Sequence, residues 1–340
     1  MSKHFTSVDQ SDRLVPYNLR QSGETPVEML IFTRVRKSPF WHLSVEAGCW
    51  RATIYNRIYH PFGYVRPEDG GTKVEYQALK NHVTMWDVAV ERQIMVKGPD
   101  AEAFVDYVIT RDATQIPPMR AKYVILCNNM GGVLNDPILL RLSKDEFWFS
   151  LADSDIGIYL QGVNHDNRFD VVIDEIDVCP LQIQGPKSLG LMEDLVGNQA
   201  DVKNLPFYGM LEAKIGGHDC VISQTGFSGE AGFEIYLRDA TLHADDLWYA
   251  VLEAGRKYQL MVTAPPHCRR IQAGILSWGQ DMDNQHNPFQ CNLGYQVSLS
   301  GKGEWNKAGN YIGKDVLEQM RSELKSGKKP YKLQLGGLQM

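Results

Sequence analysis

The chain has 340 residues, which is long enough for two or three packed units instead of a single core. Its 41 acidic residues outnumber its 35 Lys and Arg residues, so no basic surplus is available to neutralise phosphates, and we expect no nucleic-acid partner. No stretch reaches the ~18 uninterrupted apolar residues of a membrane span, and residues 1–20 lack the apolar core of a secretory signal, so we expect a cytoplasmic protein without membrane contact.

The cysteines and histidines form no metal-binding motif in the sequence. The six cysteines are scattered without a Cys-x-x-Cys pair, and the nine histidines include no His-x-x-x-His or His-Glu-x-x-His arrangement. We therefore predict free, mostly buried thiols and no bound metal.

The N-terminal part of the chain gives few structural signals. Residues 1–50 are irregular and read as an N-terminal arm, and a cluster of Gly, Pro and Asp near 60–72 predicts a surface loop. The next stretch, 72–83, has apolar residues at helical spacing and predicts a helix.

An internal echo is the strongest organisational feature. The first copy predicts a strand, a Gly98-Pro99 turn and a helix through Ile109; the second repeats this plan with Gly185-Pro186 and a helix through Leu195. Glycine permits a tight exit from the strand, and proline fits the first helical turn, where its missing N–H costs nothing. The echo predicts an α+β protein made of two related units, each a sheet with helices on one side.

Strand and helix candidates follow each copy. Strands are predicted at 123–128, 138–142, 147–151, 212–215, 219–225 and 232–237, and further helices at 241–258, near 268–278 and near 313–326. We place the units at about 51–178 and 179–330, and residues 331–340 read as the start of a C-terminal β-barrel that is largely absent.

Asp136 is the first candidate for chemistry. It follows a Gly131-Gly132 turn, and the next residue, Pro137, favours an extended backbone at Asp136, which would display the carboxylate at a strand start. The alternative is a turn carboxylate that bonds its own loop.

Glu234 is the second candidate, because it stands between apolar residues of a predicted strand. Facing inward, it could accept hydrogen bonds from the amino and ring N–H groups of a pterin-like heterocycle; the alternative is simple alternation that points it to water. Glycines at 226, 229 and 232 allow close backbone approach to a flat ligand or to another strand.

Aromatic residues could sandwich a planar cofactor or cage a cationic methyl donor, although core packing is the commoner use of such side chains. They include Trp86, Phe147, Trp148, Phe149, Phe207, Tyr208 and Trp278.

Five ordered motifs together resemble the glycine-cleavage T-protein (aminomethyltransferase) family, collinearly from about residue 72 to 318. The motifs are Val96-Lys97-Gly98-Pro99, Asn128-x-x-Gly131-Gly132-x-x-x-Asp136, Gln184-Gly185-Pro186-Lys187, Thr225-Gly226-Phe227-x-Gly229-Glu230-x-Gly232-Phe233-Glu234 and Trp278-Gly279-Gln280-Asp281-Met282-Asp283. The resemblance implies two homologous α+β domains, a C-terminal β-barrel and tetrahydrofolate bound at their junction.

The resemblance also implies roles for single residues. It places the catalytic aspartate on Asp136, the pterin-anchoring glutamate on Glu234 and a folate-contacting tyrosine on Tyr123. Paired aromatic residues of the family fall on Phe207 and Tyr208, and Phe227 completes the predicted cofactor-binding set.

The branch of the family is indicated by two further stretches. Residues 86–93 resemble the dimethylsulfoniopropionate demethylase branch, and the arginine of true T-proteins is replaced by Pro266. We therefore expect tetrahydrofolate-dependent methyl transfer from a small free donor: a sulfonium, a quaternary ammonium or a methylamine compound. A lipoyl-dependent aminomethyltransferase and a non-catalytic folate-binding accessory protein are the alternatives, and a homodimer is left open.

Overall fold

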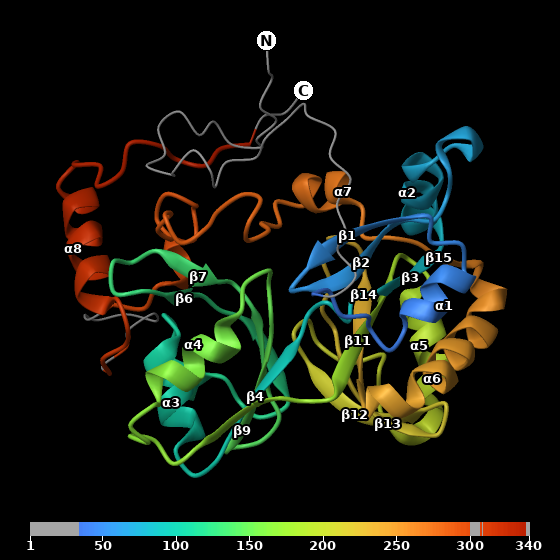
Figure 1. Cartoon of the computed structure of the whole chain (residues 1–340), viewed down its shortest axis with the longest axis horizontal. Coiled ribbons are helices and arrows are strands. Elements are labelled where there is room, and N and C mark those ends of the chain that lie inside the picture. The colour runs from blue at the N-terminus through green and yellow to red at the C-terminus, as the bar shows by residue number, and fades with distance from the viewer. Residues whose placement is uncertain (1–33, 300–306, 308, 338–340) are drawn as a thin grey trace.

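The computed structural model describes residues 34–299, 307 and 309–337, so most of the predicted N-terminal arm lies outside the described residues. The molecule contains two large, mainly antiparallel sheets, and each packs against its own helices. The two sheets with their helices form the two lobes of Figure 1. This arrangement confirms the α+β class and the two related units.

The first sheet has five antiparallel strands, and α3 (Ala101–Val108) and α4 (Ile156–Val163) pack on it through a shared apolar core. Across the sheet the strands are β10 (Val172–Glu175), β4 (Gln93–Lys97), β9 (Glu146–Ser150), β8 (Ile138–Arg141) and β5 (Arg120–Tyr123).

The second sheet has six strands, and α5 (Ser188–Val196) and α6 (Ala240–Gly255) cover its outer face (Figure 1). Across the sheet the strands are β12 (Met210–Ile215), β13 (His218–Ser223), β14 (Gly232–Arg238), β11 (Val178–Gln184), β3 (Val83–Asp87) and β15 (Leu260–Val262).

Strand β3 lies in the second sheet although its position in the chain falls in the first predicted unit. It pairs with β11 on one side and with β15, in parallel, on the other. All five of its residues are buried, so the alternation that marks a half-exposed strand is missing from its sequence.

The sequence echo corresponds to two copies of one strand–turn–helix plan, β4 to α3 and β11 to α5. A Cβ atom would lie 2.4 Å from the Asp170 carbonyl oxygen at Gly98 and 2.6 Å from the His82 carbonyl oxygen at Gly185, so both turns require glycine. The prolines lie just before the helices and not within their first turn.

The two sheets face each other across a small apolar layer. Leu140 and Trp148 of the first sheet meet Val221 and Tyr236 of the second. Along β14 the side chains alternate: Phe233, Ile235 and Leu237 join the core beneath α5 and α6, whereas Glu234 and Tyr236 point toward the opposite sheet. The twofold period of the strand therefore places Glu234 between the sheets.

The segment before the helix at 72 is more ordered than the sequence suggested. It contains a short helix, α1 (Trp41–Glu46), and a hairpin of β1 (Arg51–Tyr55) and β2 (Ile58–Gly63). The prediction of an irregular arm is wrong at α1, whereas the loop predicted near 60–72 begins only after β2, and residues 64–71 contain no strand or α-helix. The hairpin gave no clear strand signal, because β1 is mostly exposed and β2 contains Pro61, which is uncommon inside strands. The predicted helix at 72–83 is confirmed as α2 (Thr72–Asn81).

A third apolar cluster joins the β6 (Leu126–Cys127)–β7 (Val133–Asn135) hairpin to the later segment around Met282–Leu293 and to α8 (Lys314–Lys325). The strand predicted at 123–128 is thus divided between two sheets. The helix predicted near 268–278 is a single short one, α7 (His267–Gln272), and residues 331–337 form no strand.

The described part of the chain contains no helix that combines the length and apolar character needed to cross a membrane. All six cysteines are free.

Candidate functional site

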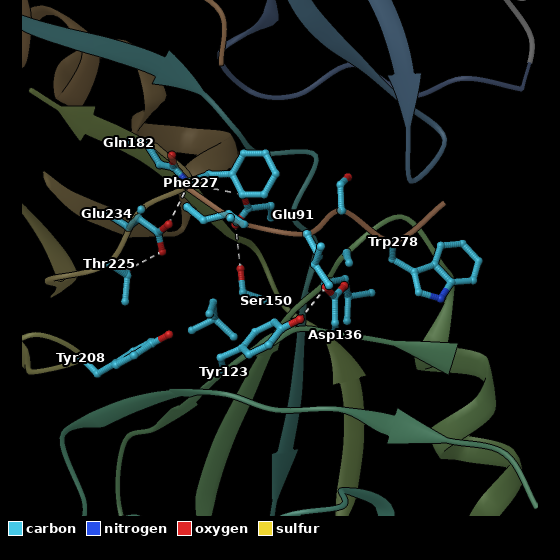
Figure 2. Close-up of a pocket in the computed structure, with 18 of the residues that line it drawn as sticks. Glu91, Tyr123, Asp136, Ser150, Gln182, Tyr208, Thr225, Phe227, Glu234 and Trp278 are labelled. Carbon is cyan, nitrogen blue, oxygen red and sulfur yellow. Dashed lines mark hydrogen bonds between the residues drawn. The ribbon is translucent and has the colours of Figure 1, made fainter. Parts of the chain in front are cut away.

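A cavity of about 270 Å³ opens between the two sheets, and all six predicted site residues line it. Figure 2 shows Glu234 and Thr225 on one side of this cavity, Asp136 and Trp278 on the other, and Tyr123 below. The six residues are Tyr123, Asp136, Phe207, Tyr208, Phe227 and Glu234.

Asp136 lies in the two-residue link between β7 and β8 and is only 7% exposed. The Tyr123 hydroxyl donates a hydrogen bond of 2.9 Å to its Oδ2, and its Oδ1 has no hydrogen-bond partner among the described residues. Burial is the main cause that raises the pKa of Asp136 to about 7, although the Tyr123 hydrogen bond opposes the shift. The carboxyl group can therefore exchange a proton near neutral pH.

Neighbouring residues explain why Asp136 points into the cavity. Asn128 serves the Gly131-Gly132 turn: its Oδ1 accepts hydrogen bonds from the backbone N–H groups of Met130 and Gly132, both at 2.9 Å. Asn135 is fully buried and donates to the Ser154 hydroxyl at 2.7 Å, which holds the end of β7. Turn stabilisation thus does not depend on Asp136.

Glu234 is held by three side-chain donors and is 3% exposed. Gln182 donates to its Oε1 at 2.7 Å, while the hydroxyl groups of Thr225 and Tyr236 donate to its Oε2 at 2.7 and 2.5 Å. Burial raises the pKa of Glu234 in spite of these donors. The alternative that Glu234 faces water is wrong.

The glycines of the 226–232 loop serve the scaffold. Cβ atoms at Gly226 and Gly232 would lie within 2.2–2.3 Å of the Gln184 side-chain amide on the neighbouring strand β11. That amide is buried and accepts a hydrogen bond of 2.6 Å from Ser228. The close approach expected from the glycines is therefore made to another strand, which fixes the loop that carries Thr225 and Phe227.

The aromatic residues divide between core and cavity. Trp86, Phe147, Trp148 and Phe149 are buried in the core, as core packing predicts. By contrast, Phe207 is 64% exposed and packs on Tyr208 with ring centroids 4.2 Å apart, so this pair stands at an open part of the cavity wall. Trp278 lines the other side and donates from its indole N–H to the Val133 carbonyl at 2.8 Å.

The GCVT N-terminal domain model matches residues 42–301 of the chain. The chain belongs to this glycine-cleavage T-protein family. The dimethylsulfoniopropionate demethylase DmdA of Ruegeria pomeroyi is 33% identical over 286 residues, 84% of this chain and 74% of that protein. An aminomethyltransferase of Thermotoga maritima is 30% identical over 269 residues, 77% of this chain and 70% of that protein.

A solved structure supports the fold of this family member. The glycine cleavage system aminomethyltransferase T from Bartonella henselae superposes with a TM-score of 0.73, at 22% identity, over 86% of this chain and 76% of its own. The comparisons confirm the family resemblance and the demethylase-like branch seen in the sequence.

The sequence analysis did not identify several residues that line the cavity of the present chain, notably Tyr55, Glu91, Ser150 and Gln182. Tyr55 belongs to β1, a strand that was not predicted. Glu91 follows the buried apolar run Val88–Val90 and is half-buried, and its position directly after this run was the available signal that it lies beside the sheet. Gln182 connects Glu91 and Glu234 through one amide, a relation between distant segments that spacing does not reveal.

One group of metal-ligand side chains also escaped the sequence motifs. His218, His243 and Asp246 meet on β13 and α6, with His218 Nε2 2.8 Å from Asp246 Oδ2. The ion pair accounts for this contact, and the group lies outside the lining of the cavity.

Replacement of Glu234 by alanine should weaken tetrahydrofolate binding by about 1–3 kcal/mol, the usual scale for leaving buried polar groups without a partner. Calorimetric titration measures the change, with Glu193→Gln on the exposed side of α5 as the control. Unchanged affinity in Glu234→Ala would remove this residue from the folate site.

Proposed function

We propose that this protein transfers a methyl group from a small free donor to tetrahydrofolate, with Asp136 as the catalytic residue. The observation that carries the proposal is a single cavity in which Asp136, with one unpartnered carboxyl oxygen, faces Glu234 across aromatic walls. Two reactants held together in such an enclosure gain rate from alignment and from exclusion of water.

Family membership supports the reaction class. The relatives named above are a demethylase of dimethylsulfoniopropionate and aminomethyltransferases, and both names describe movement of a one-carbon group of a small molecule. Tetrahydrofolate-dependent one-carbon transfer is the activity common to the family.

The residues present fit a pterin ring. Asp136 Oδ1 and Gln182 Oε1 are buried acceptors without a partner in the described part of the chain, and pterin amino and ring N–H groups are donors. The volume of about 270 Å³ suits a ring system, and the exposed Phe207 and Tyr295 leave a path for the tail of the molecule. We assign six residues to this binding site: Tyr123, Asp136, Phe207, Tyr208, Phe227 and Glu234.

Tetrahydrofolate, when bound, supplies the nucleophilic ring nitrogen that accepts the methyl group. Asp136 orients the folate nitrogen toward the donor and accepts the proton that this nitrogen loses. The bond between the methyl carbon and the donor heteroatom breaks, and its electron pair stays on the heteroatom, so a sulfonium leaves as a neutral thioether. Tyr123 fixes the carboxyl group through its hydrogen bond to Oδ2.

The donor is proposed to be free because of the segment before α7. The position that carries an arginine in true T-proteins is Pro266, which precedes the first residue of α7. A lipoylated carrier protein docks through surface charge, for which the loss of a cation is a handicap. A small onium donor needs only an enclosed aromatic pocket.

A donor panel tests the proposal. Enzyme and tetrahydrofolate are incubated separately with dimethylsulfoniopropionate, glycine betaine, dimethylglycine and aminomethyl-loaded carrier protein, and the folate products are separated. We expect 5-methyl-tetrahydrofolate with at least one free donor. Formation of 5,10-methylene-tetrahydrofolate from the carrier alone would establish an aminomethyltransferase instead, and folate binding without any product would establish an accessory protein.

A further inference from the structure

A second chamber of about 260 Å³ adjoins the folate cavity. The β1–β2 hairpin and the segment around α7 contribute to its walls, and both lie over the middle of the molecule in Figure 1. The two chambers share a common set of lining residues, so they are neighbours separated only by side chains. The shared residues are Tyr55, Glu91, Gln182, Phe227, Ser277 and Trp278.

The two chambers are lined by acidic side chains and by no Lys or Arg among the described residues. The four carboxylates are Glu91, Asp136, Asp153 and Glu234. The nearby Arg270 is itself paired with Asp281 at 2.5 Å. A concave surface lined by acids and by no Lys or Arg favours a cationic ligand, so one of these four carboxyl groups is the candidate contact for a cation.

Three of the four carboxylates have good hydrogen-bond donors. Glu234 has three, Asp136 has the Tyr123 hydroxyl, and Asp153 accepts from the backbone N–H of Asn56 at 2.7 Å. Glu91 has the longest contacts of the four: its side chain accepts a hydrogen bond from the Ser150 hydroxyl at 3.1 Å and one from the Gln182 amide at 3.4 Å.

Electrostatics agrees with this geometry. Burial, followed by the charge of Glu234, raises the pKa of Glu91 well above its usual range. An arriving cation would favour the ionised form of Glu91 and would add to the two long contacts that Ser150 and Gln182 make with it.

We propose that Glu91 recognises the positively charged centre of the methyl donor, which sits in the second chamber against the rings of Phe227 and Trp278 (Figure 2). The inference rests on the proposed function, because it names the donor class and the residue that selects it. A carboxylate together with aromatic faces is the chemical surround that favours sulfonium and methylammonium groups.

The same chamber suits a donor with an anionic end. His60 and His267 line it, and the Nδ1 atom of each is buried without a hydrogen-bond partner in the described residues. An imidazole N–H donates to a carboxylate, so a zwitterionic donor such as dimethylsulfoniopropionate is a suitable probe.

Loss of the methyl group removes the positive charge of the donor. Glu91 therefore attracts the donor more strongly than the neutral product, and the attraction weakens as the transition state forms. An interaction of this kind lowers KM without raising kcat. Glu91 is accordingly a specificity-determining residue for binding of the donor.

The test compares a cationic ligand with its uncharged counterpart. Dimethylsulfoniopropionate and 4-methylpentanoate differ in the charged sulfonium, which is a CH group in the latter. Titration of the wild-type protein should show tighter binding of dimethylsulfoniopropionate. Glu91→Gln should weaken that binding by about 10–100-fold, the lower part of the scale for close charge pairs in a binding site, and leave 4-methylpentanoate binding unchanged.

Three further variants locate the effect. Glu91→Asp, which keeps the charge, should restore part of the preference for the cation. Asp153→Asn, in the same chamber, and Glu193→Gln, exposed on α5, should both keep it. An equal loss in Asp153→Asn would overturn the assignment to Glu91, because it would show that the overall negative field selects the cation.

Kinetics separate failure of this inference from failure of the proposed function. In Glu91→Gln, KM for the free donor should rise by about 10–100-fold with kcat within about threefold. Normal KM and an unchanged cation preference, in an enzyme that makes 5-methyl-tetrahydrofolate, would overturn the role of Glu91 alone. If no donor is demethylated, the proposed function fails. The preference for dimethylsulfoniopropionate over 4-methylpentanoate in the binding titrations still decides whether Glu91 recognises a cation.

Discussion

Asp136→Asn should lower turnover by at least ~10²-fold, as expected for a positioned proton-accepting group. The amide has nearly the same shape as the carboxyl group and can still accept the Tyr123 hydrogen bond, so the fold should be retained. Its NH2 group replaces the Oδ1 acceptor, so turnover is compared at saturating tetrahydrofolate. Because the pKa of Asp136 is raised to about 7, wild-type kcat should increase as the pH rises through that value and the carboxyl group becomes ionised. The steady-state rate of 5-methyl-tetrahydrofolate formation from pH 5.5 to 8.5 measures both effects.

Tyr123→Phe is the matched control for this experiment. It removes the hydrogen bond to Oδ2 and keeps the carboxyl group, so it should reduce turnover less than Asp136→Asn does, and its pH profile should shift upward because the bond lowers the pKa of Asp136. Near-normal turnover in Asp136→Asn, or an unchanged pH profile in that variant, would contradict the catalytic role.

The sequence predicts those features of the fold that depend on local rules. The two strand–turn–helix copies were predicted because Gly98 and Gly185 occupy turns in which a Cβ atom would strike a carbonyl oxygen. The helix at α2 followed from its spacing of apolar residues. Strand β3 and the β1–β2 hairpin were not predicted, since one is buried on both faces and the other is exposed along most of its first strand.

The candidate site shows the same division. Asp136 and Glu234 each stand out locally, as a displayed turn carboxylate and as an acid within an apolar strand. Their meeting in one cavity depends on the packing of two sheets, which no local pattern describes. Glu91 was part of a motif that indicated the family branch, but its place between two chambers depends on Gln182 and on the hairpin over it. Local sequence therefore identifies single groups, whereas tertiary packing decides which of them act together.

Asp136 should also cost the folded protein stability at neutral and alkaline pH. Its folded pKa of about 7 lies above the ordinary value of 3.8, so between these values the folded state binds more protons than the unfolded state does. The free energy of unfolding then falls as the pH rises through this window, and the loss is complete above the folded pKa. A shift of this size corresponds to about 4 kcal/mol.

Asp136→Asn should consequently be more stable than the wild type by about 4 kcal/mol at pH 8 and about equally stable near pH 2.5, where the carboxyl group is protonated in both states. Urea unfolding of the two proteins at pH 2.5, 5 and 8 measures the difference, and the other buried acids, such as Asp87, cancel in the comparison. Asp174→Asn, on the exposed edge strand β10, is the control and should show no such trend. A pH-independent difference for Asp136→Asn would mean that the carboxyl group is not held protonated by burial. Asp136 would then be an ordinary ionised acid, and the proton transfer assigned to it would need another residue. The expected combination of greater stability and lost turnover in one variant would instead indicate that the protein keeps this buried carboxyl group for chemistry, at a cost to its own fold.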